Sequence, residues 1–437
     1  MLILKADHRR SFTQQPCRRA KRTSHSSRLS RLPKMCFGIA MDTARAKIPR
    51  TVWVLGFVSM FMDISSEIIH ALLPIFMTAT LGLSVAMVGL VDGIAEATAS
   101  ITKVFSGYIS DRTGKRKPLI LLGYGLGALS KPLFAVASGA VPIFGARFAD
   151  RIGKGIRGAP RDAMIADVTS PETRGRAFGL RQSLDTVGAF AGPLIAIGLM
   201  FAFAGNMRLV FWIAAIPALF AVALVIIGVE DRRSEAGETR PPLRFADLRH
   251  LQSGFWNVVF VGVLFSLARI SEAFLILRAN VEGLPLALTP LVLVVMNIVY
   301  SIGAYPAGVL SDRFPPRRLL MSGIAALMGS HIILGFADGL VAVFAGIALW
   351  GVHMALTQGI LARMVADSAP PHLVASAYGL FSLVTGLALL VGSVVAGLLW
   401  ELGGPQTTFK VAAGFATTSA FALVACRLRP VGSKNSR

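Results

Sequence analysis

Residues 107–119 read Gly107-Tyr-Ile-Ser-Asp-Arg-Thr-Gly-Lys-Arg-Lys-Pro-Leu119 and form a short basic connection between two long apolar runs. Residues 308–320 repeat the pattern as Gly308-Val-Leu-Ser-Asp-Arg-Phe-Pro-Pro-Arg-Arg-Leu-Leu320. In both copies an Asp-Arg pair follows four residues after the glycine. A repeat over this distance indicates that the two halves of the chain are copies of one structural unit.

The composition is that of a membrane protein. The chain has 437 residues, of which 54% are hydrophobic and only 15% are charged, whereas a soluble protein carries about 25% charged residues. Apolar runs of about twenty residues recur, which is long enough to cross a bilayer as helices. These runs do not alternate in polarity as the strands of a membrane barrel would. We therefore expect an all-α integral membrane protein.

The excess positive charge is placed in alternate loops. The net charge is +21, and lysine and arginine cluster at 111–118, 157–176 and 312–318, whereas the intervening loops carry none. This positive-inside pattern predicts a bacterial cytoplasmic membrane with both termini in the cytoplasm. It argues against a nucleic-acid partner. The three cysteines have no paired spacing, so neither a disulfide framework nor a metal site is expected.

We expect about twelve transmembrane helices in two pseudo-symmetric six-helix bundles, formed by residues 49–229 and 254–430. Residues 230–253 read as a charged cytoplasmic linker, and residues 431–437 as a cytoplasmic tail. Residues 1–48 are basic and lack helical periodicity, which predicts a disordered arm. This arm could bind anionic membrane lipids. Alternatively, translation begins later and the arm is not part of the protein.

The stretch Gly107-x-x-x-Asp-Arg-x-Gly-Lys-Arg resembles the loop 2–3 signature of the major facilitator superfamily, and the copy at 308–318 resembles its degenerate second form. The resemblance covers roughly residues 50–430 and implies a secondary transporter that works by alternating access. The positions that we expect to form its gating loop are Gly107, Asp111, Arg112, Gly114, Asp312 and Arg313.

Asp111 suggests how such a loop could gate transport. Its carboxylate could face the positive end of the eleventh span, near Ala375, and its basic neighbours could hold the cytoplasmic ends of the two bundles together. Breaking this contact would let one half rock against the other. The alternative is that the basic residues of the loop only set the membrane topology.

Charges inside membrane spans are costly and so are candidates for function. Asp63 and Glu67 lie four residues apart in the first span and therefore share one helix face. Repulsion between two close carboxylates favours a proton on one of them, as a proton carrier requires. The alternative is that both pair with basic residues and never titrate.

The fourth span contains Arg151-x-x-Lys154-Gly-x-Arg157-x-Ala, which resembles the helix-4 signature of proton-linked members of the superfamily, R-x-x-Q-G-x-G-x-A. Lys154 and Arg157 replace the glutamine and the glycine of that pattern. The resemblance gives Arg151 the role of adjusting the proton affinity of a neighbouring carboxylate. The additional bases could instead favour an anionic substrate, or the network could be purely structural.

The fifth span carries Arg181, Asp185 and then Gly188-x-x-x-Gly192-Pro193. The glycine-proline run resembles the antiporter signature of drug/proton exporters, although the final glycine pair of that signature is missing. Small residues four apart allow close helix contact, and the proline can kink the helix. We expect Gly188, Gly192 and Pro193 to act as a helix-5 hinge.

The resemblance also implies that spans 1, 4, 7 and 10 line a central cavity. The further residues that we expect at the substrate cavity are Glu96, Arg147, Asp150, Arg269, Glu272 and His353. Glu96 could instead make an internal salt bridge, and a lone histidine such as His353 is more often a hydrogen-bonded interior residue.

The leading hypothesis is proton-coupled export of a small organic solute, in the manner of drug/proton antiport. The alternatives are proton-coupled uptake of an anionic small molecule and a non-transporting membrane sensor or scaffold. No phosphate-binding loop, metalloprotease motif or nucleophile elbow is present, so neither an enzyme nor a cofactor is expected. We expect a monomer whose partners are the substrate, protons and membrane lipid.

Overall fold

The computed structural model describes residues 48–230, 251, 253–370 and 373–426, and within these residues every regular element is a helix. The predicted arm at 1–48, the centre of the linker at 230–253 and the tail at 431–437 fall almost wholly outside the described residues. The first half contains α2 (Arg50–Ile75), η1 (Phe76–Thr80), α3 (Val85–Thr113), α4 (Lys117–Val136), α5 (Ala140–Val168), α6 (Pro171–Ala202) and α7 (Met207–Gly228). The second half contains α8 (Ser253–Ala268), α9 (Ala273–Val281), η3 (Leu286–Leu288), α10 (Leu291–Arg313), α11 (Pro316–Phe336), α12 (Leu340–Thr357), α13 (Ile360–Ser368) and α14 (Val374–Ala425).

The described helices account for twelve membrane crossings. Ten spans are long and apolar enough to cross a membrane by length and composition. α14 counts once among them, although Gly404 has a non-helical φ of 78° and divides it into two crossings. α5 is not among the ten because its 29 residues carry many charges. Adding these two crossings gives the expected twelve and confirms the all-α membrane fold.

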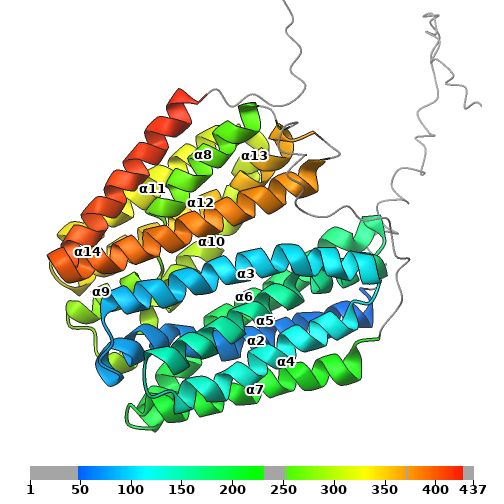
Figure 1. The fold of residues 1–437 in the computed structure, drawn as a ribbon, viewed down its shortest axis with the longest axis horizontal. Coiled ribbons are helices and arrows are strands. Elements are labelled where there is room, and N and C mark those ends of the chain that lie inside the picture. Colours follow the sequence, from blue (N-terminus) through cyan, green and yellow to red (C-terminus); the bar gives the residue numbers. More distant parts are fainter. Residues whose placement is uncertain (1–47, 231–250, 252, 371–372, 427–437) are drawn as a thin grey trace, which may run out of the picture. The chain divides into compact units, whose positions relative to one another are not determined.

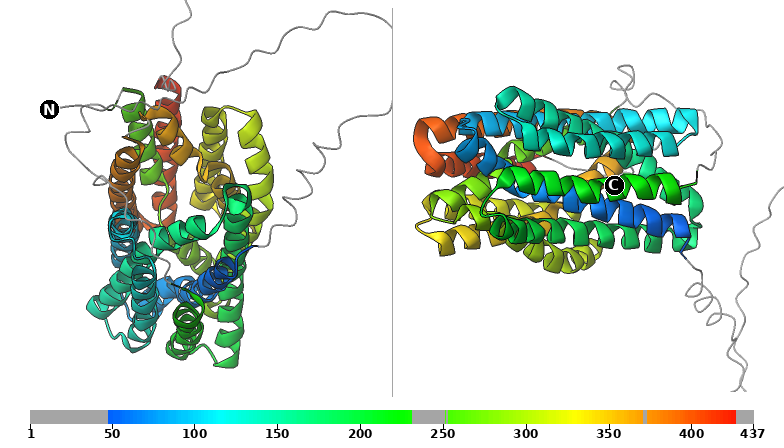
Figure 2. Two further views of the ribbon diagram at one scale, coloured as in Figure 1. Left: turned by 90° about the vertical axis from the view of Figure 1, so that its right-hand side faces the viewer. Right: turned by 90° about the horizontal axis from the view of Figure 1, so that it is seen from below.

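The helices form two groups (Figure 1). In the first half α2 packs against α6 and α7, while α5 packs between α3 and α4. In the second half α14 packs against α8 and α11, and α12 against α10 and α11. The groups meet through α3 with α14 and α6 with α10, and Figure 2 shows the same helices from two further sides.

Basic side chains close helix ends at matching positions in the two halves. Lys117 donates to the carbonyl of Ile226 at 3.1 Å, and Arg317 donates to the carbonyl of Val424 at 2.6 Å. The last carbonyls of a helix have no partner within it, so such bonds satisfy groups that would otherwise face the membrane unpaired. The recurrence supports the internal repeat read from the sequence.

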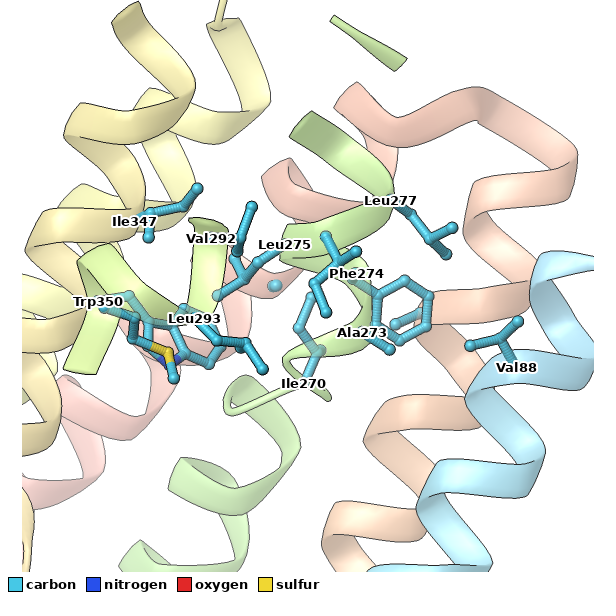
Figure 3. Packing of buried hydrophobic residues seen from close by; sticks show 14 of the residues in the cluster. Val88, Ile270, Ala273, Phe274, Leu275, Leu277, Val292, Leu293, Ile347 and Trp350 are labelled. Carbon is cyan, nitrogen blue, oxygen red and sulfur yellow. The ribbon is translucent and has the colours of Figure 1, made fainter. Parts of the chain in front are cut away.

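The two halves are in contact at the distal end, by which we mean the end at which α3, α5 and α12 begin, opposite the loop at 107–119. The backbone N–H of Ala86 donates to Glu401 at 2.9 Å, and Val88 and Phe274 belong to one apolar cluster. In Figure 3 the ring of Phe274 on α9 points toward Val88 on α3. The distal end is therefore closed by direct contact between the halves.

Two helices are interrupted inside the membrane. The seventh crossing breaks between α8 and α9, at Arg269–Glu272, and the tenth breaks between α12 and α13, where Gly359 has a φ of 81°. A positive φ of this kind is readily adopted only by glycine. Broken helices of this type place polar backbone and side chains inside a transporter.

Candidate functional site

The first half contains a cavity of about 290 Å³ that is lined by α2, α3, α5 and α6. Four acids line it: Asp63, Glu67, Glu96 and Asp185. Four bases line it as well: Lys103, Lys154, Arg157 and Arg161. Charged groups inside a membrane protein almost always face a water-filled pathway or each other, so this cavity is the candidate site.

Asp63 on α2 lies within hydrogen-bonding reach of Asp185 on α6. Two carboxyl groups can share a hydrogen bond only if one of them carries a proton, because a carboxylate is an acceptor only. Arg181, one turn before Asp185 on α6, places its Nη1 3.7 Å from that carboxylate. The structure thus brings Asp63 together with a residue from the fifth crossing.

Glu67, one turn beyond Asp63 on α2, pairs with a different group. Its Oε2 lies 3.4 Å from His70 Nδ1 on the same helix. Glu67 and Asp63 line the same cavity, but the structure shows no direct bond between the two carboxyl groups. The proton-coupling role of both residues stays a prediction.

Glycines of α6 hold the acidic face of α2 in place. A Cβ added at Gly188 would lie 2.6 Å from the Met60 carbonyl and 3.0 Å from Asp63 Cβ. A Cβ added at Gly192 would lie 2.6 Å from Glu67 Cβ. Two of the three positions predicted as a hinge are therefore points of close approach, and α6 continues as a helix through the third, Pro193. The hinge role itself stays a prediction.

Arg151 joins the acids of two helices. It lies 2.8 Å from Glu96 on α3 and 3.8 Å from Asp150 on α5, and only 5% of its surface is exposed. The internal salt bridge anticipated as an alternative for Glu96 is present. Because Glu96 lines the cavity and Arg151 holds it, Arg151 can influence the charge of the site through this bond.

Asp150 takes part in a buried ion pair rather than in the lining of the cavity. Its Oδ1 accepts a hydrogen bond from Lys131 Nζ on α4 at 2.7 Å, and both residues are almost fully buried. Lys131 also donates to Ser66 on α2 at 3.0 Å. This pair therefore connects three helices, α2, α4 and α5.

Arg147 is part of a bridge between the halves. It donates two hydrogen bonds to Asp92 Oδ1 on α3, at 2.9 and 3.2 Å. The other oxygen of Asp92 accepts a hydrogen bond from Ser271 Oγ at 2.7 Å. Ser271 lies in the break between α8 and α9 of the second half, so this chain of bonds crosses between the halves near the distal end.

Two of the three residues predicted in the second half, Arg269 and Glu272, flank Ser271 in the helix break. Glu272 lies within electrostatic range of His70, Glu67 and Glu96, and Arg269 lies within range of His353. His353 is fully buried; its Nδ1 lies 3.0 Å from the carbonyl of Gly323, and its ring packs against Phe265. A second cavity of about 340 Å³ lies nearby between α10, α12 and α13, and Tyr300, Gln358 and Arg363 contribute its polar lining.

The loop at 107–119 makes its contacts within the first half. Arg116 lies 3.4 Å from Asp111 and 2.6 Å from Asp167. Gly114 ends α3 with a φ of 63°, and Gly107 packs near Ala159 on α5. Among the described contacts Asp111 has no bond to α14, so a latch between the halves stays a prediction, as does a gating role for Arg112, Asp312 and Arg313.

Sequence reasoning did not assign three residues that the structure connects to the site: Asp185, Lys131 and Ser271. Asp185 follows Arg181 by four residues inside an apolar span, and this charged pair could have marked Asp185 as a site residue in the sequence. Lys131 stands alone in an apolar span, which is equally conspicuous. Ser271 gives no signal, because only the fold places it beside Asp92.

Comparison with known proteins gives agreeing results. The Major Facilitator Superfamily profile matches residues 55–298 and 283–437. An uncharacterised MFS-type transporter of Methanocaldococcus jannaschii is 32% identical over 393 residues, covering 86% of this chain and 95% of that protein. The class C tetracycline resistance protein of Escherichia coli is 30% identical, covering 68% of this chain and 78% of its own length. Among solved structures, the nucleoside transporter NupG has a TM-score of 0.71 at 14% identity, with 86% of this chain and 98% of that one covered.

Proposed function

This chain belongs to the Major Facilitator Superfamily, and from that premise we propose that it couples the movement of a small organic solute to the proton gradient by alternating access. It is a multi-pass membrane protein and a secondary transporter of this family. The family and the absence of an enzyme motif in the sequence both favour transport over catalysis. The use of the proton gradient, the direction of transport and the class of substrate are our proposals.

One observation carries the proton coupling: the contact between Asp63 and Asp185 beside the cavity. A shared hydrogen bond between these carboxyl groups requires one proton. If the pair separates or binds a substrate, that bond is lost and the proton can leave. The pair therefore has the chemistry of a proton carrier, and it lies on two helices whose relative movement would control it.

The surrounding groups fit a coupled site. Glu67 and His70 form a second pair one turn away that could accept the proton, and Arg151 restrains Glu96 across the cavity. Because Gly188 packs directly on the Asp63 turn, a small shift of α6 would move the two carboxyl groups relative to each other. Movement of helices and release of the proton would then be linked.

We propose export as the direction, with both termini in the cytoplasm and the protein acting as a monomer. The relative named a tetracycline resistance protein supports export, as does the partial helix-5 signature at Gly188–Pro193. Proton-coupled uptake of an anion is a second candidate, because Lys103 and Lys154 line the cavity without an ion pair to any described residue. A sensor or scaffold would show no solute flux with an intact fold.

The proposal is tested in inverted membrane vesicles that carry an imposed pH gradient and a fluorescent pH probe. A panel of drug-like compounds should trigger proton movement with the wild-type protein, and this response should be lost in Asp63→Asn and in Asp185→Asn. Asp367→Asn is the matched control, because Asp367 is half exposed on α13 and does not line the cavity. A full response in both cavity variants would refute the assignment of the proton site.

A further inference from the structure

Several basic side chains of the cavity form no direct ion pair with the acidic side chains that line it. Glu96 pairs with Arg151 at 2.8 Å, and Glu67 pairs with His70 at 3.4 Å. Asp63 and Asp185 face each other, and Arg181 lies 3.7 Å from Asp185. Each lining acid therefore has a direct contact that involves neither Lys103 nor Lys154.

Lys103 and Lys154 make no such direct contact. Both side chains are exposed at the cavity, and neither forms a hydrogen bond or an ion pair at contact distance with any described residue. Lys154 attracts Asp63, Glu67 and Glu96 only at longer range. The aliphatic part of Lys103 lies over Gly158 of α5, where its Cε would be 3.7 Å from an added Cβ. The Lys103 side chain therefore extends from α3 toward the side of the cavity that α5 forms, where Lys154 also lies.

Arg157 is a third cation at the cavity, and one of its guanidinium nitrogens has no hydrogen-bond partner among the described residues. It is 5% exposed and lines the same cavity, and its guanidinium lies 4.8 Å from the centre of the Tyr124 ring. The nitrogen without a partner is Nη1, but it is buried beside Gly127 of α4, which does not line the cavity. Arg157 therefore contributes positive charge to the cavity rather than a free donor.

Two of these three cations stand where α5 departs from the helix-4 signature that it otherwise resembles: Lys154 replaces the glutamine and Arg157 replaces a glycine. Both departures add positive charge, and both face one cavity. Charges placed in this way inside a membrane protein mark the path of a charged ligand.

We propose that Lys103, Lys154 and Arg157 form a binding site for the anionic group of a small organic anion, and that such anions are the substrate class of this transporter. The proposal rests on the proposed transport function. The cavity of about 290 Å³ is just smaller than the usual range of ligand pockets, about 300–1,000 Å³, which suits a small anion. The anionic group would accept hydrogen bonds from the ammonium groups of Lys103 and Lys154, beside the positive charge of Arg157.

The test uses permanently charged probes, because a weak acid would cross the bilayer in its neutral form and disturb the pH gradient. Naphthalene-2-sulfonate is the anion, and phenyltrimethylammonium is the cation. Binding is read from the thermal unfolding of the purified full-length protein, followed by tryptophan fluorescence. Transport is read as proton movement in reconstituted vesicles. We expect the sulfonate to stabilise the wild-type protein and to trigger proton movement, and the cation to do neither.

Lys103→Gln and Lys154→Gln should each raise the half-saturating sulfonate concentration roughly tenfold or more, since a charge-assisted hydrogen bond is lost. Lys103→Arg and Lys154→Arg keep the charge and should retain most of the binding, which separates a charge effect from misfolding. Lys410→Gln is the control, because Lys410 lies over the Phe336 ring of the second half, away from the cavity.

Measuring binding and proton movement separately distinguishes failure of the anion site from failure of proton-coupled transport. Proton movement triggered by phenyltrimethylammonium, with no effect of either lysine variant, would overturn the anion site and leave proton-coupled transport standing. Sulfonate binding that depends on both lysines, without proton movement, would support the anion site and contradict proton coupling. Sulfonate binding that is unchanged in both Gln variants would also overturn the anion site.

Discussion

The bridge from Arg147 through Asp92 to Ser271 gives a quantitative prediction about alternating access. Ser271 Oγ donates to Asp92 Oδ2 at 2.7 Å across the two halves, and Asp92 is 4% exposed. In a state with separated distal ends this bond is lost, whereas Arg147 and Asp92 remain together because both belong to the first half. The bond therefore stabilises selectively the state in which the distal end is closed.

Ser271→Ala removes this bond. A hydrogen bond to a charged group contributes about 1.5–3 kcal/mol, so the ratio of distal-closed to distal-open molecules should fall roughly 10- to 150-fold. Ser271 Oγ also accepts a bond from the N–H of Ala273 at 3.1 Å, at the start of α9. Loss of that cap weakens α9 in both states, so it lowers stability without shifting the ratio to the same extent.

The assay is a distance measurement between spin labels at Val141→Cys and Val341→Cys. These residues are 81% and 89% exposed at the distal starts of α5 and α12, one in each half. The native Cys17, Cys36 and Cys426 are first replaced by serine. Ser271→Ala should move the distance distribution toward longer separations.

Ser271→Thr keeps the hydroxyl group and should restore the wild-type distribution. An unchanged distribution in Ser271→Ala, in protein that is folded by size-exclusion chromatography, would refute the reasoning. It would mean that the apolar contacts of the distal end, such as Val88 with Phe274, determine closure without the polar bridge.

Two further predictions concern stability. Gly192→Ala places a Cβ 2.6 Å from Glu67 Cβ, so it should cost roughly 1–3 kcal/mol of unfolding free energy through overpacking. Thermal unfolding in detergent measures this cost, with Gly198→Ala on the same helix as the control, because nothing lies within 4 Å of a Cβ added there. Equal melting temperatures of the two variants would contradict the prediction. The bond from the Gly339 N–H, together with Arg278, holds the pKa of Glu282 below its usual value. The resulting stabilisation is complete above the unfolded pKa of about 4.3 and is lost as the pH falls through the lower folded pKa. The melting-temperature difference between wild type and Glu282→Gln should therefore shrink in acid, and a constant difference would exclude this linkage.

Much of the fold could be predicted from sequence because its signals are local. Membrane spans are set by length and hydropathy, and the paired loops at 107–119 and 308–320 reveal the repeat. The helix breaks were not predicted, although Gln358-Gly359 provides the glycine that the second break requires. The break at Ser271 has neither glycine nor proline at its centre, so it has no comparable local signal.

The candidate site could be predicted only in part. Helical spacing places Asp63 and Glu67 on one face of α2, and the structure puts both at the cavity. The carboxyl group that pairs with Asp63 comes from α6, however. Helical spacing within α2 carries no information about which neighbouring helix packs against it. The identity of partners in ion pairs, such as Lys131 with Asp150, likewise depends on the packing of separate helices.

The central claim is that the carboxyl groups of Asp63 and Asp185 share a proton, and infrared spectroscopy of the purified protein tests it most directly. A protonated carboxyl group has a C=O stretch that shifts in heavy water, which distinguishes it from a carboxylate. The account predicts that a band of this kind in the wild-type spectrum is absent from both Asp63→Asn and Asp185→Asn and retained in Glu67→Gln. Aspartate variants whose spectra match the wild type, or loss of a band only in Glu67→Gln, would contradict it.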